Sequence, residues 1–204
     1  MTPMFLLVCS PLLAFESPPD EPVYTQPTFE RPTDIAHDRN ERDGGRDRSL
    51  DAVTQADFIV NRLRQIQRIC SAVNEEYRLD CLATSYSSLT NALRNSGGDA
   101  VVLQSLEGAS AKLRTLVVRN LDRTKPALRA HLTNPESGAR ILSTSPIQAV
   151  QTERLPAVRQ QAVASLEEAE TVLLRSSTRI TEQSLLYQRV AEAVRSNKVL
   201  LRSA

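Results

Sequence analysis

The sequence predicts an all-α protein: a bundle of about four amphipathic helices with a long C-terminal helix, preceded by a disordered Pro-rich N-terminal segment. Apolar residues recur at alternating steps of four and three through the last three quarters of the chain. Such steps place side chains on one face of an α-helix, which turns once every ~3.6 residues. The chain has no Trp and only four aromatic residues after residue 50. A core of Leu, Val, Ile and Ala favours helix–helix packing over a deep ligand pocket, which aromatic residues usually line.

Residues 1–15 form the first predicted region, an apolar segment that resembles a signal peptide. The run from Met4 to Phe15 has the length of a signal-peptide core and is too short for a spanning helix. No Lys or Arg precedes it, so a cytoplasmic protein is the alternative to a periplasmic or secreted one. A lipid anchor at Cys9 is disfavoured, because Val8 stands where a small residue is required.

Residues 16–50 form the second predicted region, a disordered linker rich in Pro, Asp and Arg. Residues 15–50 hold nine Asp or Glu and five Arg, a net charge of −4. Such a segment buries too little apolar surface to offset its chain entropy. The other 15 acids and 20 bases lie in residues 51–204, a net charge of +5, which is typical of solvated helix faces.

Residues 51–204 form the third predicted region, the helical bundle. The first two helices are expected over residues 51–73 and 80–94. Cys70 and Cys81 would lie ~16 Å apart on one continuous helix, whereas a disulfide requires Cα atoms within ~7 Å. A disulfide between them therefore requires the chain to reverse, and the polar residues 74–77 are suited to that turn. Two buried free thiols are the alternative.

A third helix is expected to begin at Asp99, which follows Gly97-Gly98 and can cap the helix. Pro126 should end or kink it near residue 125, with a short helical continuation through Leu128 and Leu132. Residues 133–145 are expected to be a polar connection.

Ser145-Pro146 is the expected start of the long C-terminal helix, because Ser caps helices and Pro favours their first position. This helix should kink at Pro156 and continue to Leu201. Over its full length it would either bend near residues 176–178 or project beyond the bundle. The side chains expected in the core are Ile59, Leu63, Ile66, Leu82, Leu89, Leu106, Leu113, Leu173 and Ile180.

Residue patterns that support chemistry are few. His37 and His131 have no Cys or carboxylate neighbours at metal-ligand spacing, so neither a metal site nor a cofactor is predicted. The acidic group Glu167, Glu168 and Glu170 is interpreted as a solvated helix face. No catalytic residues are predicted, and a non-enzymatic protein is favoured over an enzyme whose site forms only in three dimensions.

The favoured function is therefore a non-enzymatic helical interaction or scaffolding protein of the bacterial cell envelope, exported and acting through coiled-coil-like helix faces. Its partner would be another protein or a second copy. The proposed contact surface is the C-terminal stripe Tyr187, Ala191, Val194 and Leu201; the competing interpretation is that this stripe fills the core. An alternative function is nucleic-acid association through the bases of the third helix and the residues after it: Lys112, Arg114, Arg119, Arg123, Lys125 and Arg129. That set lacks interleaved aromatic residues for base stacking, so nucleic acid is not the expected partner.

Overall fold

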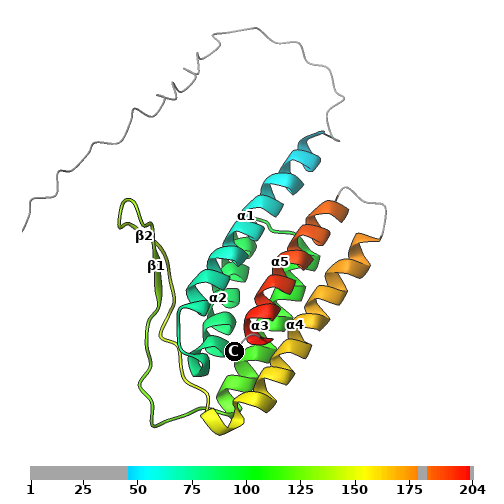
Figure 1. Ribbon diagram of the computed structural model, residues 1–204. Coiled ribbons are helices and arrows are strands. Elements are labelled where there is room, and N and C mark those ends of the chain that lie inside the picture. The colour runs from blue at the N-terminus through cyan, green and yellow to red at the C-terminus, as the bar shows by residue number, and fades with distance from the viewer. Residues whose placement is uncertain (1–45, 179–182, 203–204) are drawn as a thin grey trace, which may run out of the picture. The chain divides into compact units, whose positions relative to one another are not determined.

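The described part of the chain is a bundle of five packed helices with one small hairpin, which confirms the predicted all-α class (Figure 1). The computed structural model describes residues 46–178 and 183–202. The elements are α1 (Arg46–Ser71), α2 (Glu75–Asn95), α3 (Ala100–Arg119), β1 (His131–Thr133), β2 (Arg140–Ser143), the short 3-10 helix η1 (Thr152–Arg154), α4 (Leu155–Ser177) and α5 (Ser184–Arg202).

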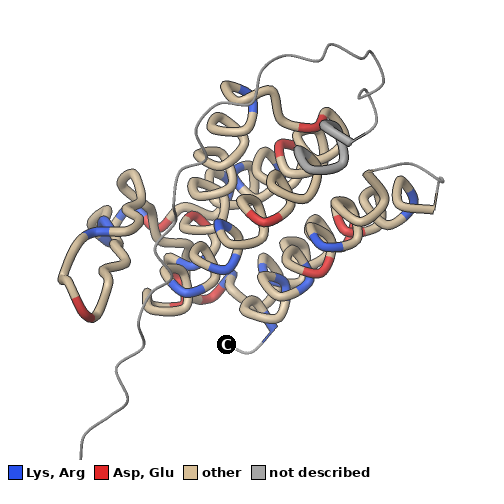
Figure 2. Tube along the Cα trace, turned by 90° about the horizontal axis from the view of Figure 1, so that it is seen from above, with Lys and Arg blue, Asp and Glu red and all other residues tan. Residues whose placement is uncertain are grey.

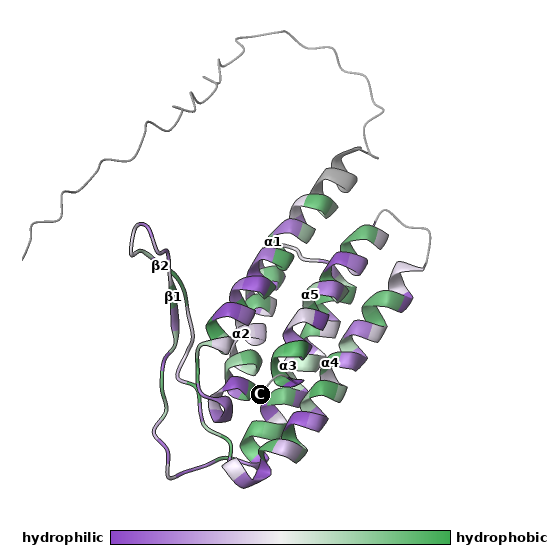
Figure 3. Ribbon diagram, viewed as in Figure 1, coloured by the Kyte–Doolittle hydropathy of each residue, from purple (hydrophilic) through white to green (hydrophobic). Residues whose placement is uncertain are grey.

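The helices pack as a closed ring, with each one beside the next along the chain. α2 packs against α3, α3 against α4, and α4 against α5. The ring closes because α5 also packs against α1, and α1 against α2. Hydrophobic and hydrophilic residues alternate along each helix, as the amphipathic pattern requires (Figure 3). Each helix therefore has one face toward the core and one toward solvent.

The predicted core is confirmed wherever the structure describes it. Ile180 lies outside the described residues, as do residues 1–45 with Cys9 and His37. The remaining predicted core side chains are all buried: Ile59, Leu63, Ile66, Leu82, Leu89, Leu106, Leu113 and Leu173.

The chain reverses between α1 and α2, and the two cysteines meet across that reversal. α2 begins at Glu75, five residues earlier than predicted, so the turn is shorter than expected. Glu75 and Glu76 lie in its first turn, where negative charge is favourable to the helix dipole. The Cys70 and Cys81 sulfur atoms lie at disulfide distance, with Cα atoms 5.6 Å apart and both residues fully buried.

The turn between α2 and α3 matches the sequence pattern. Gly97 adopts a positive φ of 71°, and the Gly98 N–H donates to the Leu93 carbonyl at 2.7 Å, which closes the end of α2. The Asp99 carboxylate accepts from the N–H groups of Val101 and Val102, so Asp99 caps α3 as predicted.

The segment after α3 differs from the prediction, because it forms an irregular hairpin rather than more helix. α3 ends at Arg119, and the Asn120 side chain donates to the Leu116 carbonyl. β1 and β2 then pair antiparallel, with a further bridge between Leu128 and Ile147. The expected helical continuation through Leu128 and Leu132 is therefore wrong. The partners of these residues lie far along the chain, where local periodicity carries no signal.

The predicted helix start at Ser145 is also wrong. The Val150 N–H donates to the Glu76 carbonyl at 2.8 Å, and the Gln148 N–H donates to the Asp80 carboxylate at 2.7 Å. These bonds to α2 hold residues 147–150 extended, with Ile147, Ala149 and Val150 buried. Pro156 lies in the first turn of α4, where it starts the helix instead of kinking it.

Two helices replace the single long C-terminal helix. α4 ends at Ser177 and α5 begins at Ser184 on the neighbouring side of the ring, so the bend near residues 176–178 is the correct alternative. At the other end, α1 begins at Arg46, inside the region predicted to be linker. In the part of the chain that the structure describes, no helix combines the length and apolar character that crossing a membrane requires.

Candidate interaction surface on helix α3

The outer face of α3 carries a second regular stripe, opposite the one that packs into the core. Its members are all exposed and uncharged, and they follow each other at steps of four, three, four and three. We call this stripe the outer seam, and its residues are Gln104, Gly108, Ala111, Thr115 and Val118. Such steps are the spacing of a helix–helix contact line. The fourth member, Thr115, donates its hydroxyl to the Ala111 carbonyl at 2.9 Å, so its hydrogen bond is already made within the helix.

The four charged residues of α3 all lie beside the outer seam, and three of them are tied to neighbouring helices. Glu107 pairs with Arg94 of α2, and Lys112 pairs with Glu168 of α4. Arg114 lies 3.7 Å from the Asp80 carboxylate of α2. Within the described residues, the fourth, Arg119, makes no ion pair. The charged side chains therefore flank the seam and leave its apolar surface uncovered.

A groove runs along each side of the outer seam. The groove between α3 and α4 has two adjoining depressions of about 320 Å³ and about 290 Å³, which share Lys112 and Ser165. Small residues line much of it, including Gly108, Ala109 and Ala169. The groove between α2 and α3 encloses about 470 Å³ and has a polar lining that includes Thr90, Asn91 and Ser110. The seam is thus a ridge between two depressions, a shape that a partner helix can pack against.

Gly108 is the one member of the outer seam that the fold itself does not explain. It lies in the middle of α3, where Gly costs about 1 kcal/mol relative to Ala. A Cβ atom built at Gly108 would meet nothing within 4 Å, and its φ lies outside the left-handed region. Neither internal packing nor backbone conformation therefore requires Gly at this position. A glycine on an exposed ridge permits close approach by another backbone.

The stripe predicted to bind a partner lies elsewhere and is not available on the surface. Tyr187 is 8% exposed, Ala191 1%, Val194 0% and Leu201 3%. Because α5 packs between α4 and α1, these four side chains fill the core of a single chain, which is the competing interpretation. We therefore correct their assignment as a contact surface. The Tyr187 hydroxyl also donates to the Asp99 carboxylate at 3.0 Å, which ties α5 to the start of α3.

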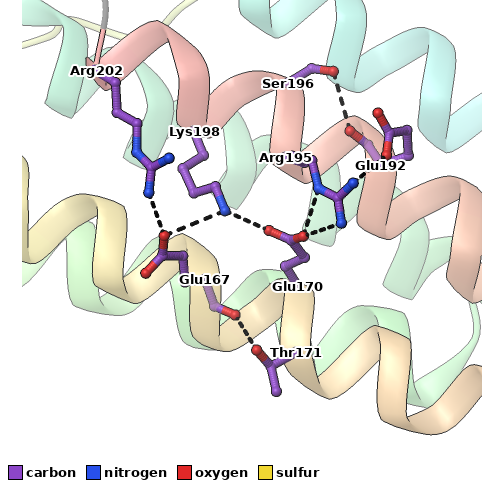
Figure 4. Close-up of polar contacts among 8 residues, drawn as sticks. All are labelled: Glu167, Glu170, Thr171, Glu192, Arg195, Ser196, Lys198 and Arg202. Atoms are coloured by element: carbon purple, nitrogen blue, oxygen red, sulfur yellow. Dashed lines mark hydrogen bonds and ion pairs between the residues drawn. The ribbon is translucent and has the colours of Figure 1, made fainter.

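An ion-pair network joins the C-terminal half of α5 to α4 (Figure 4). Lys198 is only 9% exposed, and its ammonium donates to Glu170 at 2.8 Å. Arg195 binds the other Glu170 oxygen at 2.7 Å, and Arg202 binds Glu167 at 2.6 Å. Burial opposes ionisation of Glu170, but the bonds from Lys198 and Arg195 outweigh it and lower the pKa of this carboxyl. The prediction of a fully solvated acidic face is thus wrong for Glu170.

The bases of the predicted nucleic-acid patch are partly neutralised. Lys112 and Arg114 pair as described above, and Lys125 binds Glu76 at 3.0 Å. Lys and Arg are interspersed with Asp and Glu over the helices (Figure 2). The arrangement therefore does not form a continuous positive surface along α3.

The described residues contain no candidate catalytic centre. His131 is exposed on the hairpin, and among residues 46–178 and 183–202 no group of three His, Cys, Asp or Glu could hold a metal ion. The carboxylates whose pKa values are shifted, such as Asp80 and Glu170, line neither groove. Burial raises the pKa of Asp80, but its carboxylate binds the Gln148 N–H and so anchors the hairpin connection.

The outer seam was not predicted from the sequence, although a signal for it was present. The helix that carries the predicted core residues Leu106 and Leu113 also carries an uncharged line through Gly108, an isolated glycine within a helical pattern. The structure shows that neither internal packing nor a left-handed backbone requires glycine at that position. Comparison with known protein families, curated proteins and solved structures found no match to this chain.

Proposed function

We propose that this protein is a non-enzymatic helical interaction or scaffolding protein of the bacterial cell envelope, and that the outer seam of α3 is its contact surface. The single observation that carries the proposal is the exposed glycine at position 108, in the middle of α3. Glycine in the middle of α3 costs helix stability, and we infer that close packing of another molecule against the seam compensates that cost. The grooves on both sides give that molecule room.

Export is supported by two independent features. The apolar run at residues 4–15 has the length of a signal-peptide core. Cys70 and Cys81 lie at disulfide distance, and disulfides persist mainly in oxidising compartments such as the periplasm. Together they favour an extracytoplasmic location over a cytoplasmic one.

The nucleic-acid alternative has less support. Half of the six bases that suggested it form ion pairs with carboxylates of neighbouring helices. Neutralised bases release few counterions from a phosphate backbone, and counterion release supplies most of non-specific affinity.

Replacing Gly108 with leucine is expected to release the protein from its native assembly. A Cβ atom at Gly108 meets nothing within 4 Å among the described residues, and Leu favours helix, so we expect the fold to persist while the side chain blocks close approach to the seam. Native gel electrophoresis of solubilised cell envelopes should show the wild-type chain in a larger species and the variant free. Asn61→Leu is the matched control, because Asn61 is exposed on α1, which does not neighbour α3 in the ring. Identical migration of all three proteins as free chains would contradict the proposed function.

A further inference from the structure

We propose that the oxidation of Cys70 and Cys81 to a disulfide is a redox switch that orders the hairpin arm of this protein. The arm is residues 121–150, which include β1 and β2 and run alongside the helices (Figure 1). In the reduced chain the helices persist and the arm is loose, whereas in the oxidised chain the arm is fixed on α2. The switch is separate from the outer seam, because no residue of the seam belongs to the arm.

The arm is tied to the α-helices at one place, the first two turns of α2. Within the described residues, four hydrogen bonds of 2.7 to 3.0 Å join the arm to an α-helix, and all four end on Glu76, Tyr77 or Asp80. We call these three residues the anchor. Their partners lie near the two ends of the arm: Lys125, Pro126, Gln148 and Val150. The anchor therefore holds both ends of the arm on one helix.

The disulfide fixes the anchor to the end of α1. Cys81 follows Asp80 directly and lies about one helical turn after Tyr77, so the anchor moves with Cys81. Its partner Cys70 lies in the last turn of α1, and both cysteines are fully buried. The reversal that separates the two helices is short, so the disulfide sets how closely the start of α2 lies against α1.

Reduction displaces the anchor because the thiols cannot remain where the bonded sulfur atoms were. Two unbonded sulfur atoms need more room than two bonded ones, and a close-packed interior supplies no spare room. The start of α2 therefore moves away from α1, and the hydrogen bonds of the arm lose their alignment. Ile147 and Val150 of the arm are fully buried, so their packing is disturbed as well. The helices keep their ring, because α5 packs against both α1 and α4.

The oxidation requires an acceptor for two electrons, and the oxidant we propose is the disulfide of another thiol compound or protein. The thiolate of one cysteine attacks a sulfur atom of that disulfide, which breaks and leaves a mixed disulfide. The thiolate of the other cysteine then attacks the chain's own sulfur in the mixed disulfide, forms the bond between Cys70 and Cys81, and releases the oxidant as a dithiol. The chain loses two electrons and two protons, and the oxidant gains both. The arm is therefore ordered once the chain reaches an oxidising compartment.

Nuclear magnetic resonance relaxation of the purified full-length chain tests the switch, because backbone order parameters report motion on the picosecond to nanosecond timescale. In the oxidised chain the amides of Leu128 and Thr144, which are hydrogen-bonded within the arm, should have order parameters of about 0.85, as in a rigid backbone. Reduction with dithiothreitol should lower both to below about 0.6, while the amides of α3 and α4 keep their values.

Three variants separate the switch from a general loss of stability. Glu170→Ala keeps the disulfide and is expected to lose a similar free energy of unfolding, so its arm should stay rigid. Tyr77→Phe combined with Asp80→Ala removes two of the four hydrogen bonds, so its arm should be loose without reduction. In Cys70→Ala combined with Cys81→Ala, dithiothreitol should change nothing.

An arm that is as rigid after reduction as before overturns the switch. Complete unfolding of the reduced chain also overturns it, because the helices must persist. If the arm of Glu170→Ala is as loose as that of the reduced wild type, the loosening follows stability alone and the switch is wrong. A rigid arm in the oxidised Tyr77→Phe, Asp80→Ala variant has the same consequence, because the anchor would then not hold the arm.

Discussion

Replacing Glu170 with alanine is expected to lower the free energy of unfolding by about 3 kcal/mol. Removing one partner of a buried ion pair leaves the other charge uncompensated, and such losses are typically about 3–5 kcal/mol. Lys198 would keep only Glu167, whose carboxylate lies 3.5 Å from its ammonium. We place the loss at the lower end of that range because this contact and solvent partly compensate the charge. Urea unfolding followed by circular dichroism measures the change.

Two matched variants show whether the loss comes from the stranded lysine. Glu170→Leu combined with Lys198→Met should cost less than Glu170→Ala alone, because apolar residues of similar size often replace a buried ion pair at little cost. Glu168→Ala removes an exposed ion pair nearby and should cost at most about 1 kcal/mol. Equal losses for Glu170→Ala and Glu168→Ala would show that burial of the network contributes nothing.

The ionisation of Glu170 also makes the free energy of unfolding depend on pH, and the lowered pKa of this carboxyl sets the direction of that dependence. The pKa of Glu170 is lowered from its ordinary value of 4.5 in the folded chain, so its ionisation stabilises the fold above pH 4.5. That contribution is lost as the pH falls through the folded-state pKa. When the pH is lowered from 5 to below the folded-state pKa of Glu170, the free energy of unfolding should therefore fall less for the Glu170→Leu, Lys198→Met variant than for the wild type.

Removing the link between Cys70 and Cys81 is expected to cost roughly 3 kcal/mol of stability. In the chain-entropy model, closing a loop of about twelve residues stabilises by that amount through the unfolded state. The double substitution Cys70→Ala, Cys81→Ala also removes two fully buried sulfur atoms from the core. Denaturant unfolding of the variant should match that of the wild type in reductant, apart from the small packing loss.

Peptide mapping under non-reducing conditions tests directly whether Cys70 and Cys81 are covalently joined. Trypsin digestion of protein taken from cells should yield two peptides, one with Cys70 and one with Cys81, joined by a disulfide. Two free thiols in the native protein, with no effect of reductant on unfolding, would remove both the predicted stabilisation and the argument for export that depends on the disulfide.

Local sequence signals predicted the parts of the fold that local chemistry decides. The core positions Leu106 and Leu113 of α3, the Asp99 cap and the reversal between Cys70 and Cys81 all depend on residues within about three helical turns of each other. Short-range spacing and capping rules are sufficient for such features. For the same reason the predicted core side chains that the structure describes are buried.

The hairpin and the extended residues 147–150 depend on partners that spacing does not reveal. Gln148 binds Asp80, and Val150 binds Glu76, across about seventy positions of sequence. Lys198 shows the same limit, because its ammonium binds Glu170 of α4, 28 positions away along the chain. The outer seam was visible as a pattern, but its interpretation required knowing that a Cβ atom at Gly108 would meet nothing within 4 Å among the described residues.

Photo-cross-linking from the outer seam in living cells tests the central claim most directly. A photoreactive residue at Thr115 places the probe within the seam, and the same residue at Asn61 provides an exposed control on α1. The account predicts a discrete cross-linked product from position 115 that is absent from position 61 and is lost when Gly108→Leu is added. Mass spectrometry of that product identifies the partner. Illumination that gives no product from position 115, or equal products from both positions, would show that α3 presents no specific contact surface.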